Sequence, residues 1–312
     1  MTGFSIIDAH VHTYGSRKIG RQAMMGSGHT DYGGTVDELL DLMVRGGIEK
    51  AVMVNMTPVV EMFDAAVAKL PSDLSGAELA EAENDIRRQM IGRLQRRNQW
   101  TCEMAREHPQ LTAFIGLDPS MSDEKLVAEI DRRRDEGAGG PTGARLRGIK
   151  LHPANQRFYP NDRRLWPVYQ RAQELDLPII FHSGAFALGP RPTDHAHPRY
   201  FPEVLSAFPH LTVVMAHLAF GDFAACADLA RAHPNVFFDC CYIINGTEKS
   251  PALNDEEAAA ALRLVGTDRV MFGSDYPWFD PVLDAARIQR LPLTDADKRA
   301  VLHENAERVF AL

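Results

Sequence analysis

Two histidines stand two residues apart near the start of the chain, in the segment Asp8-Ala9-His10-Val11-His12. The apolar run from Ser5 to Val11 predicts a strand that ends at this pair. Side chains two apart on a strand point to the same side, so both imidazoles could reach one metal ion. His195 and His197 have the same spacing, but prolines surround them, and we interpret this second pair as part of a solvated loop.

Three more polar residues follow predicted strands further along the chain. His182 comes after Pro-Ile-Ile-Phe, His217 after Val-Val-Met-Ala, and Asp275 after Met-Phe-Gly-Ser. Polar side chains gathered at one end of a sheet are costly to bury without a cation or strong partners. A single histidine at a strand end is usually a core residue, but the repeated coincidence favours metal ligands. Nitrogen and oxygen donors of this kind indicate zinc first, with manganese, iron or nickel as alternatives.

Short apolar runs alternate with segments of helical spacing along the whole chain. We predict an α/β protein with one domain, residues 1–312, folded as a (β/α)₈ TIM barrel, because no linker or change of composition divides the sequence. The predicted strands are Ser5 to Val11, Lys50 to Asn55, Leu111 to Leu117, Leu146 to Leu151, Leu177 to Phe181, Leu211 to Ala216, Val236 to Cys240 and Arg269 to Gly273.

Two of the predicted strand-to-helix connections are long. The first insertion covers residues 13–34, after the first strand, and the second covers residues 56–109, after the second strand. Active sites of such barrels form at the end where these connections lie. We therefore expect both insertions to cover the mouth of the barrel.

The charge of the chain argues against a nucleic-acid partner. Its 312 residues include 34 Lys and Arg against 42 Asp and Glu, a net charge of −8, without a dense basic run. Arginines crowd the helical segment from Glu78 to His108, Arg97 among them, but acidic residues precede them. We interpret this segment as a solvated or subunit-contacting helix.

The sequence predicts a cytoplasmic protein without membrane association. No stretch approaches the roughly 18 apolar residues that cross a bilayer, and the beginning of the chain has no signal-peptide pattern. The four cysteines lack CxxC spacing, so we expect no disulfide framework. The adjacent Cys240 and Cys241 are interpreted as buried, unreactive thiols.

Several motifs together resemble one known family. They are DAHVH at residues 8–12, GIKLHP at 148–153, PIIFHSG at 178–184, AHL at 216–218, FGSDYP at 272–277 and NAERVF at 305–310. The sequence resembles the amidohydrolase superfamily over essentially its whole length. Within it, the motifs are most similar to the amidohydrolase-related branch that includes aminocarboxymuconate semialdehyde decarboxylase.

The resemblance implies a role for each strand-end residue. His10, His12, His182 and Asp275 would bind one divalent metal ion. His217 would be a catalytic histidine that is not a ligand, and Asp275 would also accept a proton from activated water. We expect Asp8 to support His10 from behind.

Lys150 leaves the number of metal ions open. In members of the superfamily with two metals, a lysine at this position is carboxylated and bridges both ions, and His182 and His217 would then hold the second ion. In the decarboxylase branch no bridging lysine is expected, and we favour a single ion. Otherwise Lys150 is an ordinary ammonium group, paired with a carboxylate or with an anionic substrate.

We expect the substrate to be a small molecule bound by residues of the strand-to-helix connections, namely Arg157, Tyr159, Arg191, His195, Trp278 and Phe279. The favoured function is metal-dependent hydrolysis of an amide, ester or lactone. The alternative is non-hydrolytic decarboxylation of an aromatic or unsaturated acid, and the lowest-ranked hypothesis is an inactive ligand-binding barrel. Barrels of this branch are often dimers, which makes a homodimer compatible with the resemblance and leaves the oligomeric state open.

Overall fold

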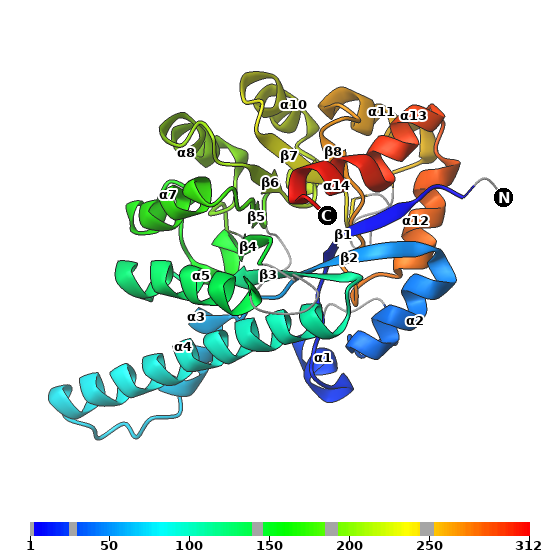
Figure 1. Cartoon of the computed structure of the whole chain (residues 1–312). Coiled ribbons are helices and arrows are strands. Elements are labelled where there is room, and N and C mark those ends of the chain that lie inside the picture. Colours follow the sequence, from blue (N-terminus) through cyan, green and yellow to red (C-terminus); the bar gives the residue numbers. More distant parts are fainter. Residues whose placement is uncertain (1–2, 25–29, 139–145, 185–192, 244–252) are drawn as a thin grey trace.

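The computed structural model describes residues 3–24, 30–138, 146–184, 193–243 and 253–312. Within these residues eight parallel strands pair in chain order. Val11 bridges Tyr276, and the amide of Ala9 donates to the carbonyl of Phe272, so the last strand region meets the first. The predicted TIM-barrel fold is confirmed (Figure 1). The strands are β1 (Ile6–Val11), β2 (Ile48–Val54), β3 (Leu111–Gly116), β4 (Gly148–Leu151), β5 (Ile179–Phe181), β6 (Val213–Met215), β7 (Val236–Asp239) and β8 (Val270–Met271).

Helices surround the barrel on its outer face (Figure 1). Many begin with a side-chain cap that satisfies free backbone amides, such as Thr35 and Ser75, each with a reciprocal glutamate three residues later. The α-helices are α1 (Arg17–Ala23), α2 (Val36–Gly46), α3 (Val59–Val67), α4 (Gly76–Glu107), α5 (Asp123–Ala138), α6 (Pro153–Gln156), α7 (Trp166–Glu174), α8 (Phe201–Ala207), α9 (Leu218–Gly221), α10 (Phe223–Ala232), α11 (Asp255–Val265), α12 (Pro281–Arg290), α13 (Asp295–Arg299) and α14 (Asn305–Phe310). Shorter helical turns are η1 (Arg163–Leu165), η2 (Pro198–Tyr200) and η3 (Ala300–Glu304).

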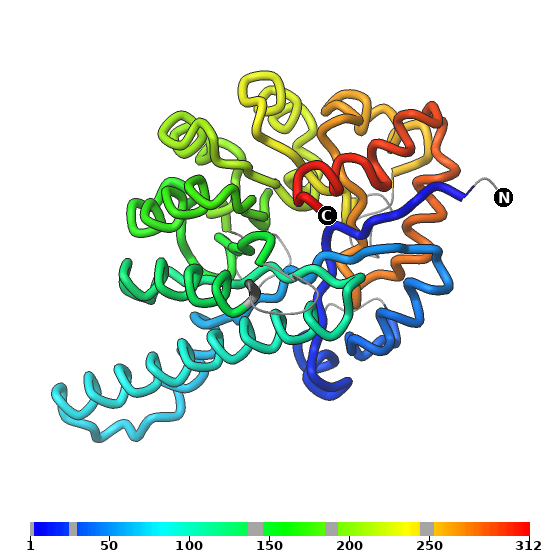
Figure 2. The backbone as a smooth tube through the Cα atoms, viewed as in Figure 1, coloured from blue at the N-terminus to red at the C-terminus, as the bar shows by residue number. Residues whose placement is uncertain are grey.

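The second insertion forms α3 and the long helix α4. The tube view in Figure 2 shows the hairpin of α3 and the first half of α4 projecting away from the barrel. Buried residues of α4 begin at Ile86 and continue through Met90 and Leu94 to Ala105. The buried part of α4 therefore begins at Ile86, and the part of the insertion before it, which was expected to cover the mouth, instead extends from the body.

Side chains of the strands alternate between the barrel interior and the surrounding helices. The helix-facing side forms the larger apolar cluster, which includes Ala51, Ile115, Ile149 and Phe181. The interior cluster is smaller and ends against α14, where the rings of Phe114 and Phe310 pack edge to face. Its strand members are Ile7, Ala9, Val52, Val54, Phe114, Ile180, Val214, Phe237 and Met271.

An irregularity in β1 decides where its histidines point. Ile7 and Ala9 face the interior, whereas Val11 packs in the outer cluster. Strict alternation from Ile7 would have placed Val11 inside and both histidines outside. The register of β1 shifts before Val11, and this bulge-like irregularity turns His10 and His12 inward.

Candidate metal centre

His10, His12 and Asp275 converge at the carboxyl-terminal end of the barrel. One donor atom from each lies within 4.8 Å of the other two. Asp275 Oδ1 is 3.4 Å from His12 Nε2 and 3.6 Å from His10 Nε2. The amide of Asp275 also donates to the carbonyl of His10 at 2.9 Å, which ties the segment after β8 to β1. Three predicted ligands thus share one point in space.

Asp239, at the end of β7, orients the His10 ring. Its Oδ2 lies 2.8 Å from His10 Nδ1, which leaves Nε2 directed toward Asp275. The other carboxylate oxygen accepts the backbone amide of His217 and the Cys241 thiol, both at 2.8 Å. A carboxylate behind a ligand histidine selects its tautomer and raises its basicity. Asp239 was not among the predicted site residues, although an acidic residue at the end of a buried strand was a usable signal.

Asp8 has a different role from the one expected. Its Oδ1 accepts the backbone amides of His10 at 3.1 Å and Ser274 at 3.0 Å, and the His10 ring bonds to Asp239 instead. Burial raises the pKa of Asp8 to about 7, against the lowering effect of its hydrogen bonds from Ser274 and His10. Asp8 therefore fastens the irregular part of β1 to the segment after β8.

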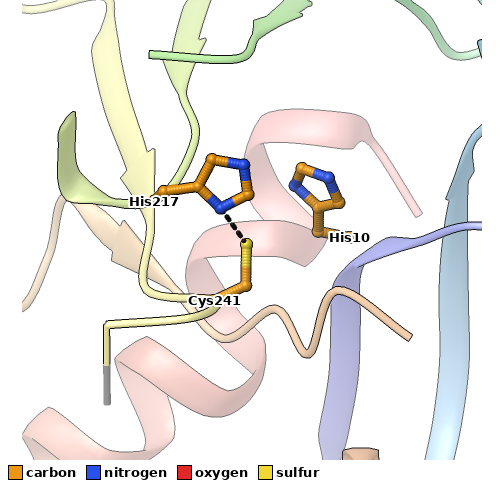
Figure 3. A group of neighbouring side chains, drawn as sticks. All are labelled: His10, His217 and Cys241. Atoms are coloured by element: carbon orange, nitrogen blue, oxygen red, sulfur yellow. Dashed lines mark hydrogen bonds between the residues drawn. The ribbon is translucent and has the colours of Figure 1, made fainter. Parts of the chain in front are cut away.

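A second histidine group lies beside these ligands. His217 Nε2 is 3.1 Å from His182 Nδ1, and the His182 ring stacks on His152 with 3.8 Å between centroids. Cys241 Sγ lies 3.0 Å from His217 Nδ1, and His10 faces this pair (Figure 3). His10, His217 and Cys241 form another group with donor atoms within 4.8 Å of one another. His182 contacts His217 in this structure, and its role as a fourth ligand stays a prediction.

Two residues of the site have left-handed backbone conformations. His217 has φ 62° and Asp275 has φ 60°. Leu218, Ala219 and Phe220 continue the run after His217, with φ between 43° and 55°. Each such conformation costs a residue other than glycine about 1–3 kcal/mol and persists where the surrounding structure enforces it. At both positions it accompanies a polar side chain directed into the site.

The protonation states of the site residues are those that bind a cation. Burial lowers the pKa of His10 and of His12, and it lowers the pKa of His217 to about 4. Burial alone would raise the pKa of Asp275, but the His12 hydrogen bond and the nearby His10 hold it below its usual range. Neutral imidazoles beside an ionised carboxylate are the forms that bind a divalent metal. The donor set therefore fits the predicted ion.

Lys150 points into the same space from β4. It is buried, and its Nζ lies 3.4 Å from His10 Nε2. Burial lowers the pKa of Lys150, against the opposing effect of Asp239 and Cys241. The lysine is thus placed beside the metal ligands, and carboxylation of its amine stays a prediction.

The predicted substrate residues lie in different surroundings. Trp278 packs edge to face on His12, with 5.3 Å between centroids, and so borders the metal ligands. Tyr159 stacks on His195 at 4.5 Å. Arg157 is exposed and pairs with Asp64 of α3 at 2.7 Å. Arg191 lies outside the described residues.

Further aromatic rings flank His217, and of these Phe220 and Tyr242 were not among the predicted residues. Phe220 lies 5.1 Å from the His217 ring, Tyr242 lies 5.0 Å from Phe220, and Phe279 lies 5.7 Å from Tyr242. With Trp278 against His12, aromatic side chains border both ends of the histidine cluster. These surfaces can stack on a planar ligand.

Solved structures of other proteins share the fold of this chain. An uncharacterised TIM-barrel protein from Bordetella bronchiseptica is 21% identical with a TM-score of 0.70, and 98% of each chain is covered. A 2,6-dihydroxybenzoate decarboxylase from Rhizobium is 15% identical with a TM-score of 0.64, and 99% of each chain is covered. A 5-carboxyvanillate decarboxylase from Novosphingobium aromaticivorans, solved with manganese and 4-hydroxy-3-methoxy-5-nitrobenzoic acid, is 16% identical with a TM-score of 0.65, covering 99% of this chain and 97% of that chain. At these identities the likeness concerns the fold.

In the described part of the chain, no helix combines the length and hydrophobicity needed to span a bilayer. No curated protein matches the sequence. The family model Amidohydro_2, described as amidohydrolase, matches residues 7–312. Because this match covers nearly the whole chain, the protein belongs to the amidohydrolase family and is an enzyme of that metal-dependent superfamily.

Proposed function

We propose that the protein is a metal-dependent decarboxylase of a hydroxylated aromatic acid or a similar unsaturated carboxylic acid. The observation that carries this proposal is the aromatic border of the metal centre, with Trp278 against His12 and Phe220 against His217. A planar acid could stack there with its carboxyl group directed at the ligands. Two solved structures of the same fold are decarboxylases of aromatic acids, which supports the proposal. This reaction was the alternative in the sequence analysis, and the aromatic border moves it ahead of hydrolysis.

A divalent ion held by His10, His12 and Asp275, with His182 as a further candidate ligand, supplies Lewis-acid stabilisation of negative charge. Zinc and manganese are the candidates, and manganese is the ion named with one decarboxylase of this fold. The protein groups around it hold the substrate and exclude water. Asp239 keeps His10 Nε2 directed toward Asp275.

Decarboxylation breaks a carbon–carbon bond, releases carbon dioxide and requires one proton on the carbon left behind. The proton would come from a hydroxyl group of the substrate or from solvent, and the ionised Asp275 or the neutral His217 would accept it and pass it to that carbon. The pKa of His217, lowered by burial to about 4, keeps its imidazole neutral at neutral pH. A neutral imidazole donates from one nitrogen only, and Cys241 and His182 hold the two nitrogens in fixed directions.

His217→Asn tests this role. We expect turnover of an accepted acid to fall about 10²–10⁴-fold, the usual range for a lost proton-transfer group, with metal content unchanged. His210→Asn is the matched control, because His210 is exposed and lies outside the site. Carbon dioxide release from a panel of hydroxybenzoates by the manganese-loaded and zinc-loaded proteins gives the rates. Unchanged turnover by His217→Asn would remove His217 from the mechanism.

Hydrolysis of an amide, ester or lactone is the second candidate. The observation that favours it is Lys150, whose buried amine lies 3.4 Å from His10 Nε2 and has a lowered pKa. A neutral amine can be carboxylated by carbon dioxide, as in two-metal members of the superfamily. Metal analysis of wild type and Lys150→Ala separates the two candidates, because two ions falling to one or none supports hydrolysis, and one ion in both proteins supports decarboxylation.

Isotope labelling gives an independent answer. In water labelled with oxygen-18, hydrolysis places the label in the organic product, whereas decarboxylation forms no new carbon–oxygen bond in it. Release of carbon dioxide with an unlabelled organic product is the result we expect. Protein that takes up no zinc or manganese on dialysis would favour the inactive ligand-binding barrel.

A further inference from the structure

Arg97 of α4 reaches the edge of the metal centre from the second insertion. Its guanidinium donates to the carbonyl of Thr13, the residue that directly follows the ligand His12. The guanidinium carbon lies 4.7 Å from the ring centre of Tyr14 and 4.9 Å from that of Trp100. The two rings and one carbonyl set the direction of this side chain.

Hydrogen bonds hold this part of α4 against the carboxyl ends of β2 and β3. The Asn98 side chain donates to the carbonyl of Gly116 and accepts its amide, both at 2.9 Å. The Asn55 side chain, just beyond β2, donates to Thr101 at 2.9 Å and accepts the amide of Thr13 at 2.9 Å. The position of Arg97 beside β1 therefore follows from a network of buried bonds.

Arg97 lacks an acidic partner within the described residues. No Asp or Glu of that set lies within ion-pair distance, and one carbonyl accepts from its five donors. Arg88, on the exposed part of the same helix, pairs with Asp85. Burial lowers the pKa of Arg97 to about 10. A partly buried cation without an anion is costly, and a bound anionic group removes that cost.

Arg97 thus lies against the two residues that directly follow the ligand His12. Its guanidinium donates to the carbonyl of Thr13 and lies over the ring of Tyr14. An acid bound to the metal ligands could therefore extend toward Arg97.

We infer that Arg97 is an anion-binding residue for a second acidic group of the substrate, which makes the substrate an aromatic or unsaturated dicarboxylate. The inference rests on the proposed function, in which the first carboxylate lies at the metal ligands. The planar guanidinium suits a carboxylate, because two parallel N–H groups can donate to its two oxygens. The interpretation of this segment as a solvated helix therefore fits the first half of α4 and not Arg97.

Binding measured without turnover tests the inference. Dissociation constants for salicylate, 4-carboxysalicylate and 5-carboxysalicylate are determined by calorimetry on the metal-loaded protein at 0.15 M salt. The variants are Arg97→Met, Arg97→Lys and the control Arg96→Met, which removes the same charge one residue away on the exposed side of α4. Thermal melting shows that each variant is folded.

We expect at least one dicarboxylate to bind wild type tenfold or more tightly than salicylate. Arg97→Met should bring this ratio close to one, Arg97→Lys should retain part of it, and Arg96→Met should retain all of it. If Arg97→Met does not fold, a several-fold lower ratio in Arg97→Lys supports the inference and an unchanged ratio overturns it. Equal binding of mono- and dicarboxylates by wild type, absent binding of the dicarboxylates, or a preference that survives in Arg97→Met also overturns it.

The outcomes of these experiments distinguish the proposed reaction from the anion-binding role of Arg97. A dicarboxylate preference that depends on Arg97, without release of carbon dioxide, supports the anion-binding role and removes the proposed reaction. Release of carbon dioxide with no effect of Arg97→Met on the ratio supports the reaction and removes the anion-binding role.

Discussion

The Asp239→Asn variant tests whether Asp239 determines which ring nitrogen of His10 carries the proton. Asp239 Oδ2 lies 2.8 Å from His10 Nδ1, and Oδ1 accepts the amide of His217 at 2.8 Å. Asparagine has one acceptor oxygen, and if that oxygen stays on His217, its NH₂ group faces His10 Nδ1. The imidazole proton then moves to Nε2, the nitrogen directed toward Asp275. That nitrogen can no longer bind a cation.

We expect manganese affinity to fall 10–100-fold in Asp239→Asn, as for other losses of a group behind a ligand histidine. This range corresponds to about 1.4–2.7 kcal/mol. Metal-free protein prepared with a chelator is titrated with Mn²⁺ in competition with a fluorescent chelator. Asp118→Asn is the matched control, because Asp118 is also a buried carboxylate but bonds to Ser120 and Gln156.

The thermal midpoint of both variants is measured to separate lost binding from lost folding. If folded Asp239→Asn binds Mn²⁺ within twofold of wild type, the orienting role of Asp239 is refuted. An equal loss of affinity in Asp118→Asn would refute it as well, because any buried carboxylate would then have the same effect.

Two further predictions concern packing and pH. A Cβ added at Gly273 would lie 2.9 Å from the Cβ of His10, so Gly273→Ala should weaken Mn²⁺ binding and destabilise the fold by about 1–3 kcal/mol. Gly15→Ala, where a Cβ meets nothing within 4 Å, should change neither in the same titration and denaturation measurements, and an equal effect there would contradict the reasoning. Burial lowers the pKa of His217 from 6.5 to about 4. Below pH 6.5 the unfolded chain therefore takes up a proton that the folded chain does not, and the free energy of unfolding decreases as the pH falls. Between pH 8 and pH 5, the free energy of unfolding of metal-free wild type should fall by about 2 kcal/mol more than that of His217→Asn in chemical denaturation. Asp8, whose pKa is raised to about 7, changes the stability in the opposite direction but is present in both proteins. Equal losses would contradict the buried, neutral state of His217.

The fold could be predicted from local patterns. Buried parallel strands are short and apolar, and they recur between helical segments at intervals that suit a barrel. Residues that follow such strands must meet at one end, which is why His10, His12 and Asp275 could be named together. Lys150 and His217 lie at the same end for the same reason.

Other features depend on contacts between distant parts of the chain. Asp239 meets His10 only because β7 and β1 face the same interior, and no spacing in the sequence records that pairing. Arg97 looks like its exposed neighbours along α4, and only the packing of that helix on β3 distinguishes it.

The alternation of side chains along a strand is a local property, so the sequence alone determined that His10 and His12 lie on one side of β1. Which side they occupy depends on the register shift before Val11 and on the bonds from Asp8 to the segment after β8. That shift is maintained by closure of the barrel, which brings residues more than 260 positions apart into hydrogen-bond contact. Only the tertiary structure could decide it, because the energy that favours one register comes from neighbours that the local sequence does not contain.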